Sequence, residues 1–149
     1  MIQPFEYYER EKLVEKTVLN IGLAKSLMEK AEIRLNRILK EGITDPEAPL
    51  IFEDTYEAIR ESAQALMQLA KYKPLSHEAI ISFLQKHKYM SEEKINLLNN
   101  YRILRNKSVY LAEKISIEKC KEAIKFAKGV LPEIKRKFEE LVKNDKSKL

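Results

Sequence analysis

The segment from Tyr101 to Glu113, YRILRNKSVYLAE, combines strong helical patterning with polar groups that can take part in chemistry. Successive residues of an α-helix are rotated by about 100°, so Leu97, Leu104 and Leu111 fall within roughly 40° of one another. We expect this leucine stripe to face the core.

The opposite side of the same helix mixes apolar and polar residues, which are Ile95, Leu98, Arg102, Arg105, Asn106, Val109, Tyr110 and Glu113. The helix is therefore predicted to be covered on two faces. An arginine buried there needs a partner, since an unpaired buried charge costs several kcal/mol. The guanidinium fork matches carboxylate and phosphate groups. Two interpretations follow: a structural arginine network at a helix or dimer contact, or a phosphate or RNA site formed by Arg102, Arg105, Asn106 and Tyr110.

Composition favours one helical domain spanning residues 1–149. Apolar residues make up 44% of the chain and charged residues 34%, with three Gly and five Pro. This balance is typical of a globular, helix-rich protein, and no block of alternating β-branched residues indicates a sheet. The sequence predicts an all-α fold, an antiparallel up-down bundle of four to five helices.

The expected helices in the first half of the chain follow from apolar spacing and from turn residues. Residues 5–41 are predicted helical with a break near 20–22, so residues 1–18 form an N-terminal extension or a short helix. The segment TDPEAP, residues 44–49, is predicted to be a loop. Asp54 is expected to begin the next helix, with Glu57 completing a capping box.

Serine caps mark the helices of the second half. Ser76 is expected to cap a short helix ending near His87, and Ser91 to cap the central helix, which runs to about Lys114. Ser116 is expected to cap the last helix, whose apolar positions repeat in steps of three and four. Residues 144–149 are predicted to be a flexible basic tail.

Several kinds of function are excluded by what the sequence lacks. It has one cysteine, Cys120, and two histidines, which indicates no internal disulfide, no metal and no cofactor. It contains no glycine-rich phosphate loop, no HExxH and no GxSxG motif. A soluble, cytoplasmic protein without membrane contact is expected, since no apolar run of 18 residues exists. The net charge of +5 permits nucleic-acid binding, and abundant Lys, Glu and Ile resemble heat-adapted, archaeal-type proteins.

His77 follows directly after a predicted helix cap. A histidine at such a position is more often a surface or capping-region residue than a catalytic base, and no nucleophile is near it in sequence. We therefore expect no catalytic role for His77.

Three stretches together resemble the HEPN superfamily. They are TYEAIRESAQALM (55–67), LSHEAIISFLQKH (75–87) and RNKSVYLAEKISIEKCKEAIKFA (105–127). Their order and spacing are similar to those of small archaeal and bacterial HEPN proteins encoded beside a minimal nucleotidyltransferase. The resemblance extends from about Asn20 to Phe138.

This resemblance implies a homodimer of helical bundles, in which the arginine-bearing helices of the two subunits lie near each other. Many HEPN proteins are metal-independent ribonucleases whose motif is Arg, a polar residue, and then His. Arg105 and Asn106 match the first two elements, but Tyr110 stands in place of the histidine. Neither His77 nor His87 matches that position. A tyrosine of ordinary pKa, near 10, is a poor base at neutral pH.

Three functions remain open from sequence. The first is a HEPN-domain partner of a minimal nucleotidyltransferase in a toxin-antitoxin-like pair, which binds nucleotide or RNA while its catalysis is weak or lost. The second is an active ribonuclease toxin in which Arg105, Asn106 and Tyr110 are catalytic. The third is a non-catalytic dimerisation or interaction module.

Overall fold

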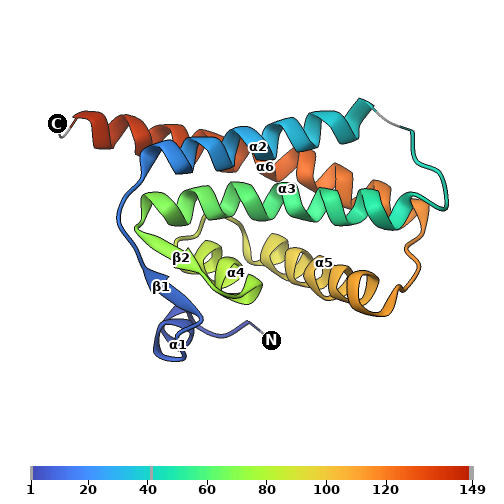
Figure 1. Ribbon diagram of the computed structural model, residues 1–149, viewed down its shortest axis with the longest axis horizontal. Helices are drawn as coiled ribbons and strands as arrows, with labels where there is room; N and C mark the ends of the chain where they lie inside the picture. The colour runs from blue at the N-terminus through green and yellow to red at the C-terminus, as the bar shows by residue number, and fades with distance from the viewer. Residues whose placement is uncertain (1, 41, 148–149) are drawn as a thin grey trace.

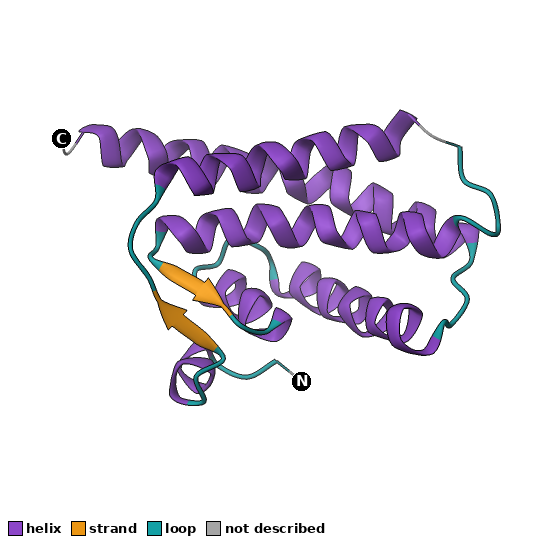
Figure 2. Cartoon of the chain, viewed as in Figure 1, coloured by secondary structure: helices purple, strands orange, loops and turns teal. Residues whose placement is uncertain are grey.

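The computed structural model describes residues 2–40 and 42–147, and within these it forms a bundle of helices with one small two-stranded sheet (Figures 1 and 2). The elements are α1 (Phe5–Arg10), β1 (Val14–Lys16), α2 (Ile21–Lys40), α3 (Ala48–Leu69), β2 (Tyr72–Pro74), α4 (His77–Lys86), α5 (Glu92–Leu111) and α6 (Ile117–Ser147). The predicted all-α bundle is confirmed. The two strands were not expected.

Helix α3 lies at the centre of the bundle because it packs against α2, α4, α5 and α6. Its sequence suits this position. Phe52, Ile59 and Leu66 are fully buried, and the small residues Ala58 and Ala65 between them allow neighbouring helices to approach closely. Helices α2 and α6 run along one side of α3, and α4 and α5 follow one another along another side (Figure 1).

The serine caps form as expected. Ser76 Oγ accepts a hydrogen bond from Ala79 N at 3.1 Å, and Ser91 Oγ accepts one from Lys94 N at 3.3 Å. Ser116 Oγ accepts from Lys119 N at 3.1 Å. Each bond satisfies a backbone donor of the first helical turn, which typically stabilises a protein by about 1 kcal/mol.

The prediction that Asp54 begins a helix is wrong. Helix α3 begins six residues earlier, at Ala48, and Pro49 lies in its first turn. Proline fits there because its ring fixes a helical φ and the first turn needs no N–H donor. Asp54 instead pairs with two arginines of α2, Arg34 at 3.0 Å and Arg37 at 3.3 Å.

A short helix, α1, lies within residues 1–18 as one of the two expected alternatives, but both ends of the chain also have features that were not predicted. The N-terminal helix ends at Arg10, and the segment after it pairs through β1 with β2, in antiparallel register with Val14 opposite Pro74. At the other end α6 continues to Ser147 and so includes most of the segment expected to be a flexible tail. Residues 148 and 149 lie outside the described residues.

The leucine stripe predicted for the central helix is confirmed in part, because Leu97 and Leu104 are partly buried and pack against the core, whereas Leu111 does not. The buried residues of α5 are Ile95, Leu98, Tyr101 and Ser108. Leu111 is 73% exposed. Helix α5 packs mainly against α3 and α4, and Tyr101 also contacts Glu122 and Phe126 of α6, but these contacts leave Leu111 uncovered. The helix also ends at Leu111, where Ala112 takes a left-handed conformation with φ of 52°.

Candidate functional site

The two arginines of α5 point toward the same region but have different partners. Arg102 Nη1 lies 3.5 Å from Glu78 Oε1 of α4, and Arg102 Nε donates to Asn99 Oδ1 at 2.9 Å. The Arg102 side chain is 13% exposed. Arg102 therefore connects α5 to the beginning of α4.

The guanidinium of Arg105 rests on the aromatic face of Tyr56, with Cζ 6.0 Å from the ring centroid. Its Nη1 donates to Asn106 Oδ1 at 3.1 Å. Within the described part of the chain, no carboxylate forms an ion pair with Arg105. Arg105 is thus a half-buried cation whose hydrogen-bonding capacity is largely unused.

Tyr56 of α3 joins this arginine to a histidine of α4. Tyr56 is 3% exposed, and its hydroxyl lies 3.1 Å from His77 Nδ1. The two rings are nearly parallel, at 13°, with centroids 5.7 Å apart. Side chains from α3, α4 and α5 therefore meet at one place, because α4 begins beside the middle of α3.

A third arginine, Arg60, lies one turn further along α3. It forms an ion pair with Glu57 and donates to Gln64. We refer to Tyr56, Arg60, His77, Arg102 and Arg105 as the Tyr56 cluster.

The carboxylates near the cluster already have partners. Glu57 pairs with Arg60, Glu78 pairs with Arg102, and Glu53 accepts a hydrogen bond from Ser108 at 2.9 Å. Among the described residues the three arginines of the cluster are matched in number by these three carboxylates, but Arg105 is the cation without a directly bound acid. An anionic ligand could therefore pair with the Arg105 guanidinium.

The environment shifts the titration of the groups in the cluster. Burial lowers the pKa of His77, and the guanidinium groups of Arg105, Arg60 and Arg102 lower it further, against a smaller opposing effect of Glu57. His77 is therefore neutral at pH 7. Burial also raises the pKa of Tyr56, so its hydroxyl keeps its proton. Burial alone would raise the pKa of Glu57, but Arg60 and Arg105 lower it overall.

The structure brings together only part of the set predicted from sequence. Arg102, Arg105 and Asn106 lie in or beside the Tyr56 cluster. Tyr110 is 74% exposed on the last turn of α5, and five residues along a helix correspond to a rotation of about 140° from Arg105. The structure thus places Tyr110 away from the unpaired guanidinium.

Two members of the cluster, Tyr56 and His77, were not among the predicted site residues. His77 was expected to be a surface or capping residue because sequence proximity shows no partner for it. The available signal was the resemblance itself, since Tyr56 lies in the first of the three motif stretches and His77 in the second.

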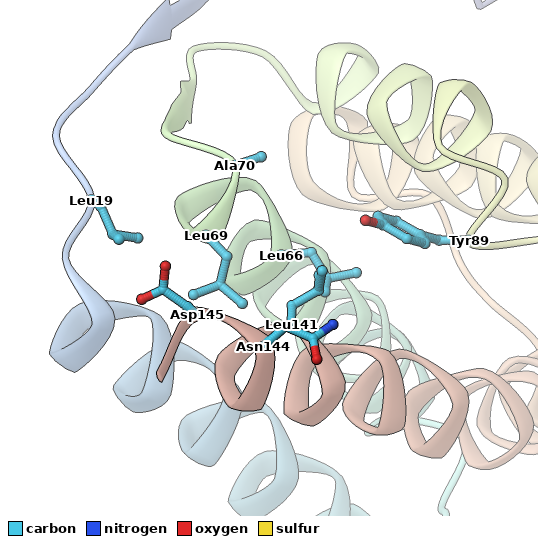
Figure 3. A pocket seen from close by; sticks show the side chains of 8 residues that line it. All are labelled: Leu19, Leu66, Leu69, Ala70, Tyr89, Leu141, Asn144 and Asp145. Atoms are coloured by element: carbon cyan, nitrogen blue, oxygen red, sulfur yellow. The ribbon is translucent and has the colours of Figure 1, made fainter. Parts of the chain in front are cut away.

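A separate pocket of about 270 Å³ lies at the C-terminal end of α3 (Figure 3). Its walls come from the segment before α2, from α3, from the loop before α5 and from α6, and they consist of Leu19, Leu66, Leu69, Ala70, Tyr89, Leu141, Asn144 and Asp145. None of these residues belongs to the Tyr56 cluster. The pocket and the cluster are therefore distinct features.

In residues 2–40 and 42–147, no group of three or more His, Cys, Asp or Glu side chains is placed to hold a metal ion. No helix in these ranges has the length and apolar character needed to cross a membrane.

Comparisons of this chain with protein-family models, with curated proteins and with solved structures find no match. The interpretation of the site therefore depends on its own geometry.

Proposed function

We propose that this chain binds a phosphate group of RNA or of a nucleotide through the Tyr56 cluster, with Arg105 as the principal contact. The observation that carries the proposal is the half-buried Arg105 guanidinium, which lies on Tyr56 and pairs with no carboxylate of the described chain. A guanidinium can hold phosphate through two parallel hydrogen bonds. The bond from Arg105 to Asn106 fixes the fork before a ligand arrives.

The biological setting we propose is a HEPN-type protein that works with a minimal nucleotidyltransferase in the cytoplasm, its catalysis weak or lost. Support comes from the three motif stretches, because Tyr56, His77 and Arg105, one from each stretch, meet in space. The set of exposed apolar residues on α5 supports a homodimer through this helix, and it comprises Ile103, Val109, Tyr110 and Leu111.

A ribonuclease is the second candidate, favoured by one observation. An imidazole, His77, lies beside the same tyrosine ring as the unpaired Arg105, although no histidine occupies the expected position five residues after Arg105. In this candidate the proton-transfer group would come from α4 instead of α5.

The purely structural interpretation fits Arg102 better than Arg105. Arg102 is largely buried and paired with Glu78, as expected of a residue that fastens two helices together. Arg105 has no such acidic partner.

The test is incubation of the purified protein with labelled single-stranded RNA in the absence of metal, with retention and cleavage both recorded. Arg105→Ala should weaken retention about tenfold or more, because a charge-assisted hydrogen bond contributes about 1.5–3 kcal/mol. Lys107→Ala is the matched control, since it removes an equal charge from an exposed position of the same helix. It should change retention about twofold or less.

Equal retention by wild type and Arg105→Ala, or no retention by wild type, would contradict the proposal. Cleavage that disappears in Arg105→Ala would instead establish the ribonuclease candidate.

A further inference from the structure

The hydrogen bond between Tyr56 and His77 determines which ring nitrogen of His77 is available to a ligand. His77 Nδ1 lies 3.1 Å from the Tyr56 hydroxyl. Among the residues that the structure describes, this hydroxyl has no other hydrogen-bond partner. A buried O–H that donates to no acceptor is costly. The Tyr56 hydroxyl therefore donates this hydrogen bond, and His77 Nδ1 accepts it.

A neutral imidazole carries a single N–H, so with Nδ1 as acceptor the proton must be on Nε2. A second proton on the ring is opposed by burial and by Arg60, Arg102 and Arg105, which face His77 from α3 and α5. Glu57 acts in the opposite direction on His77, but within the described part of the chain it is already paired with Arg60. His77 is thus held as a neutral ring with Nε2–H.

We propose that His77 Nε2–H is a ligand-binding donor that shares with Arg105 one phosphate group of the RNA or nucleotide. This inference rests on the proposed function and assigns to the site a residue from α4. Both groups lie against the Tyr56 ring, the His77 ring at 5.7 Å and the Arg105 Cζ at 6.0 Å between centres. A neutral donor adds a hydrogen bond to phosphate without adding a fourth positive charge beside three guanidinium groups.

The assignment has a chemical consequence. In the free protein neither nitrogen of His77 can accept a proton from a ribose hydroxyl, because Nδ1 is engaged by Tyr56 and Nε2 already carries a hydrogen. The site therefore holds phosphate without activating the neighbouring 2′-hydroxyl. The direction of the hydrogen bond from Tyr56 to His77 thus allows the site to bind phosphate but not to cleave RNA.

Two amide substitutions distinguish the ring nitrogens. His77→Gln places an amide nitrogen near the position of Nε2, whereas His77→Asn reaches only as far as Nδ1. With a fluorescein-labelled single-stranded RNA as probe at pH 7.5, His77→Gln should bind within about threefold of wild type, and His77→Asn about tenfold more weakly. Equal binding by the two variants, whether both retain or both lose affinity, would overturn the proposal.

A second measurement needs neither a variant of His77 nor a ligand. The chain has two histidines, so His87→Gln leaves His77 as the only imidazole. Long-range ¹H–¹⁵N correlation spectra at pH 7.5 should show a neutral ring with the proton on Nε2. A proton on Nδ1, or a charged ring, would overturn the assignment.

The two proposals fail in different ways. If wild-type protein retains no RNA, the proposed function is wrong, whichever tautomer the spectra show. If retention depends on Arg105 but is the same for His77→Asn and His77→Gln, only the role of His77 is wrong.

Discussion

Arg102 and Arg105 lie three residues apart on α5, but their surroundings give them different tasks. Arg102 is paired with Glu78 and bonded to Asn99, whereas Arg105 rests on Tyr56 and has no acidic partner among the residues that the structure describes. The difference arises from α4, whose first turn places Glu78 beside Arg102.

This difference predicts that alanine substitutions of the two arginines will change the free energy of unfolding by different amounts. Arg102→Ala should lower the free energy of unfolding by about 1 kcal/mol, because it removes the ion pair between Arg102 of α5 and Glu78 of α4. The loss is modest because the Glu78 side chain is partly exposed. Arg105→Ala should leave stability within about 0.5 kcal/mol of wild type, because it also relieves repulsion among the arginines. Urea unfolding of wild type and of both variants measures these changes in the free energy of unfolding. The reverse order of destabilisation would contradict the division of roles.

The lowered pKa of His77 predicts how stability depends on pH. Its pKa in the folded protein lies below the ordinary value of 6.5, so between those two values the unfolded chain binds more protons. Protonation then favours unfolding, and the stability contributed by neutral His77 is lost as pH falls below about 6.5. The pKa of His87 is lowered in the same direction.

Urea unfolding at pH 7 and pH 5 tests this dependence. Wild type should lose more stability over that interval than His77→Gln, and the double variant His77→Gln/His87→Gln should lose least. If His77→Gln loses as much as wild type, His77 is not held neutral by its surroundings.

Among single residues, those whose surroundings come from one helix were the most accessible to sequence reasoning. Arg102, Arg105 and Asn106 were identified because polar residues inside an apolar pattern require partners. Cys120 was expected to be a small apolar core residue, and it is buried, which raises the pKa of its thiol to about 11. The partners of His77 could not be identified in this way, because Tyr56 and Arg105 reach it only through the packing of α3 and α5 against α4.

At the scale of elements, α2 and α3 are joined by a network of ion pairs along their contact. Glu61 of α3 has a side chain that is 2% exposed, and it accepts a bond from Arg34 Nε at 2.9 Å. Lys30 lies 3.4 Å from the same carboxylate, and Asp54 pairs with Arg34 and Arg37. A buried carboxylate is tolerated here because two cations compensate its desolvation.

Arg34→Met should therefore destabilise the protein by about 3 kcal/mol, since it leaves the buried Glu61 carboxylate with Lys30 alone. Arg37→Met provides the comparison, because Arg37 is mostly exposed and pairs only with Asp54. That variant should change stability by about 0.5 kcal/mol or less. Similar losses in the two variants, measured by thermal or urea unfolding, would contradict the importance assigned to Glu61.

The start of a helix could be predicted where a side chain caps it. It could not be predicted where packing against other elements determines the first residue. Ser76, Ser91 and Ser116 each accept the expected backbone hydrogen bond. The start of α3 was misplaced because the Asp54–Glu57 pair looks like a capping box, although both carboxylates pair with arginines. The strands β1 and β2 have three residues each, too few for a periodic pattern, and their register depends on tertiary contact.

In the molecule as a whole, α3 contributes to two separate features, one at its middle and one at its C-terminal end. The Tyr56 cluster lies where α4 begins and α5 passes, and the pocket of Figure 3 lies where α3 ends beside α6. The bundle architecture was predictable, since each helix has an apolar face. Which side of α5 would be covered was not, because apolar residues occur on both sides of that helix.

The exposed apolar residues of α5 predict self-association. Ile103 is 41% exposed and Tyr110 is 74% exposed, one heptad apart on the same side of the helix. We expect wild type to sediment as a dimer and Ile103→Asp/Tyr110→Asp to sediment as a monomer with unchanged helix content. Leu50→Asp, at an exposed position of α3, is the control and should remain dimeric. A wild type that is monomeric at high micromolar concentration would contradict the proposed dimer.

Binding of RNA at Arg105 can be observed directly through the arginine Nε–H signals in ¹H–¹⁵N spectra while single-stranded RNA is added, with the signals assigned by individual Arg→Lys substitutions. We expect the Arg105 signal to shift most. The Arg102 signal should shift less, because its Nε already donates to Asn99, and the signals of Arg34 and Arg37 should stay in place. An Arg105 signal that does not move while RNA binds would show that the ligand lies elsewhere on the protein.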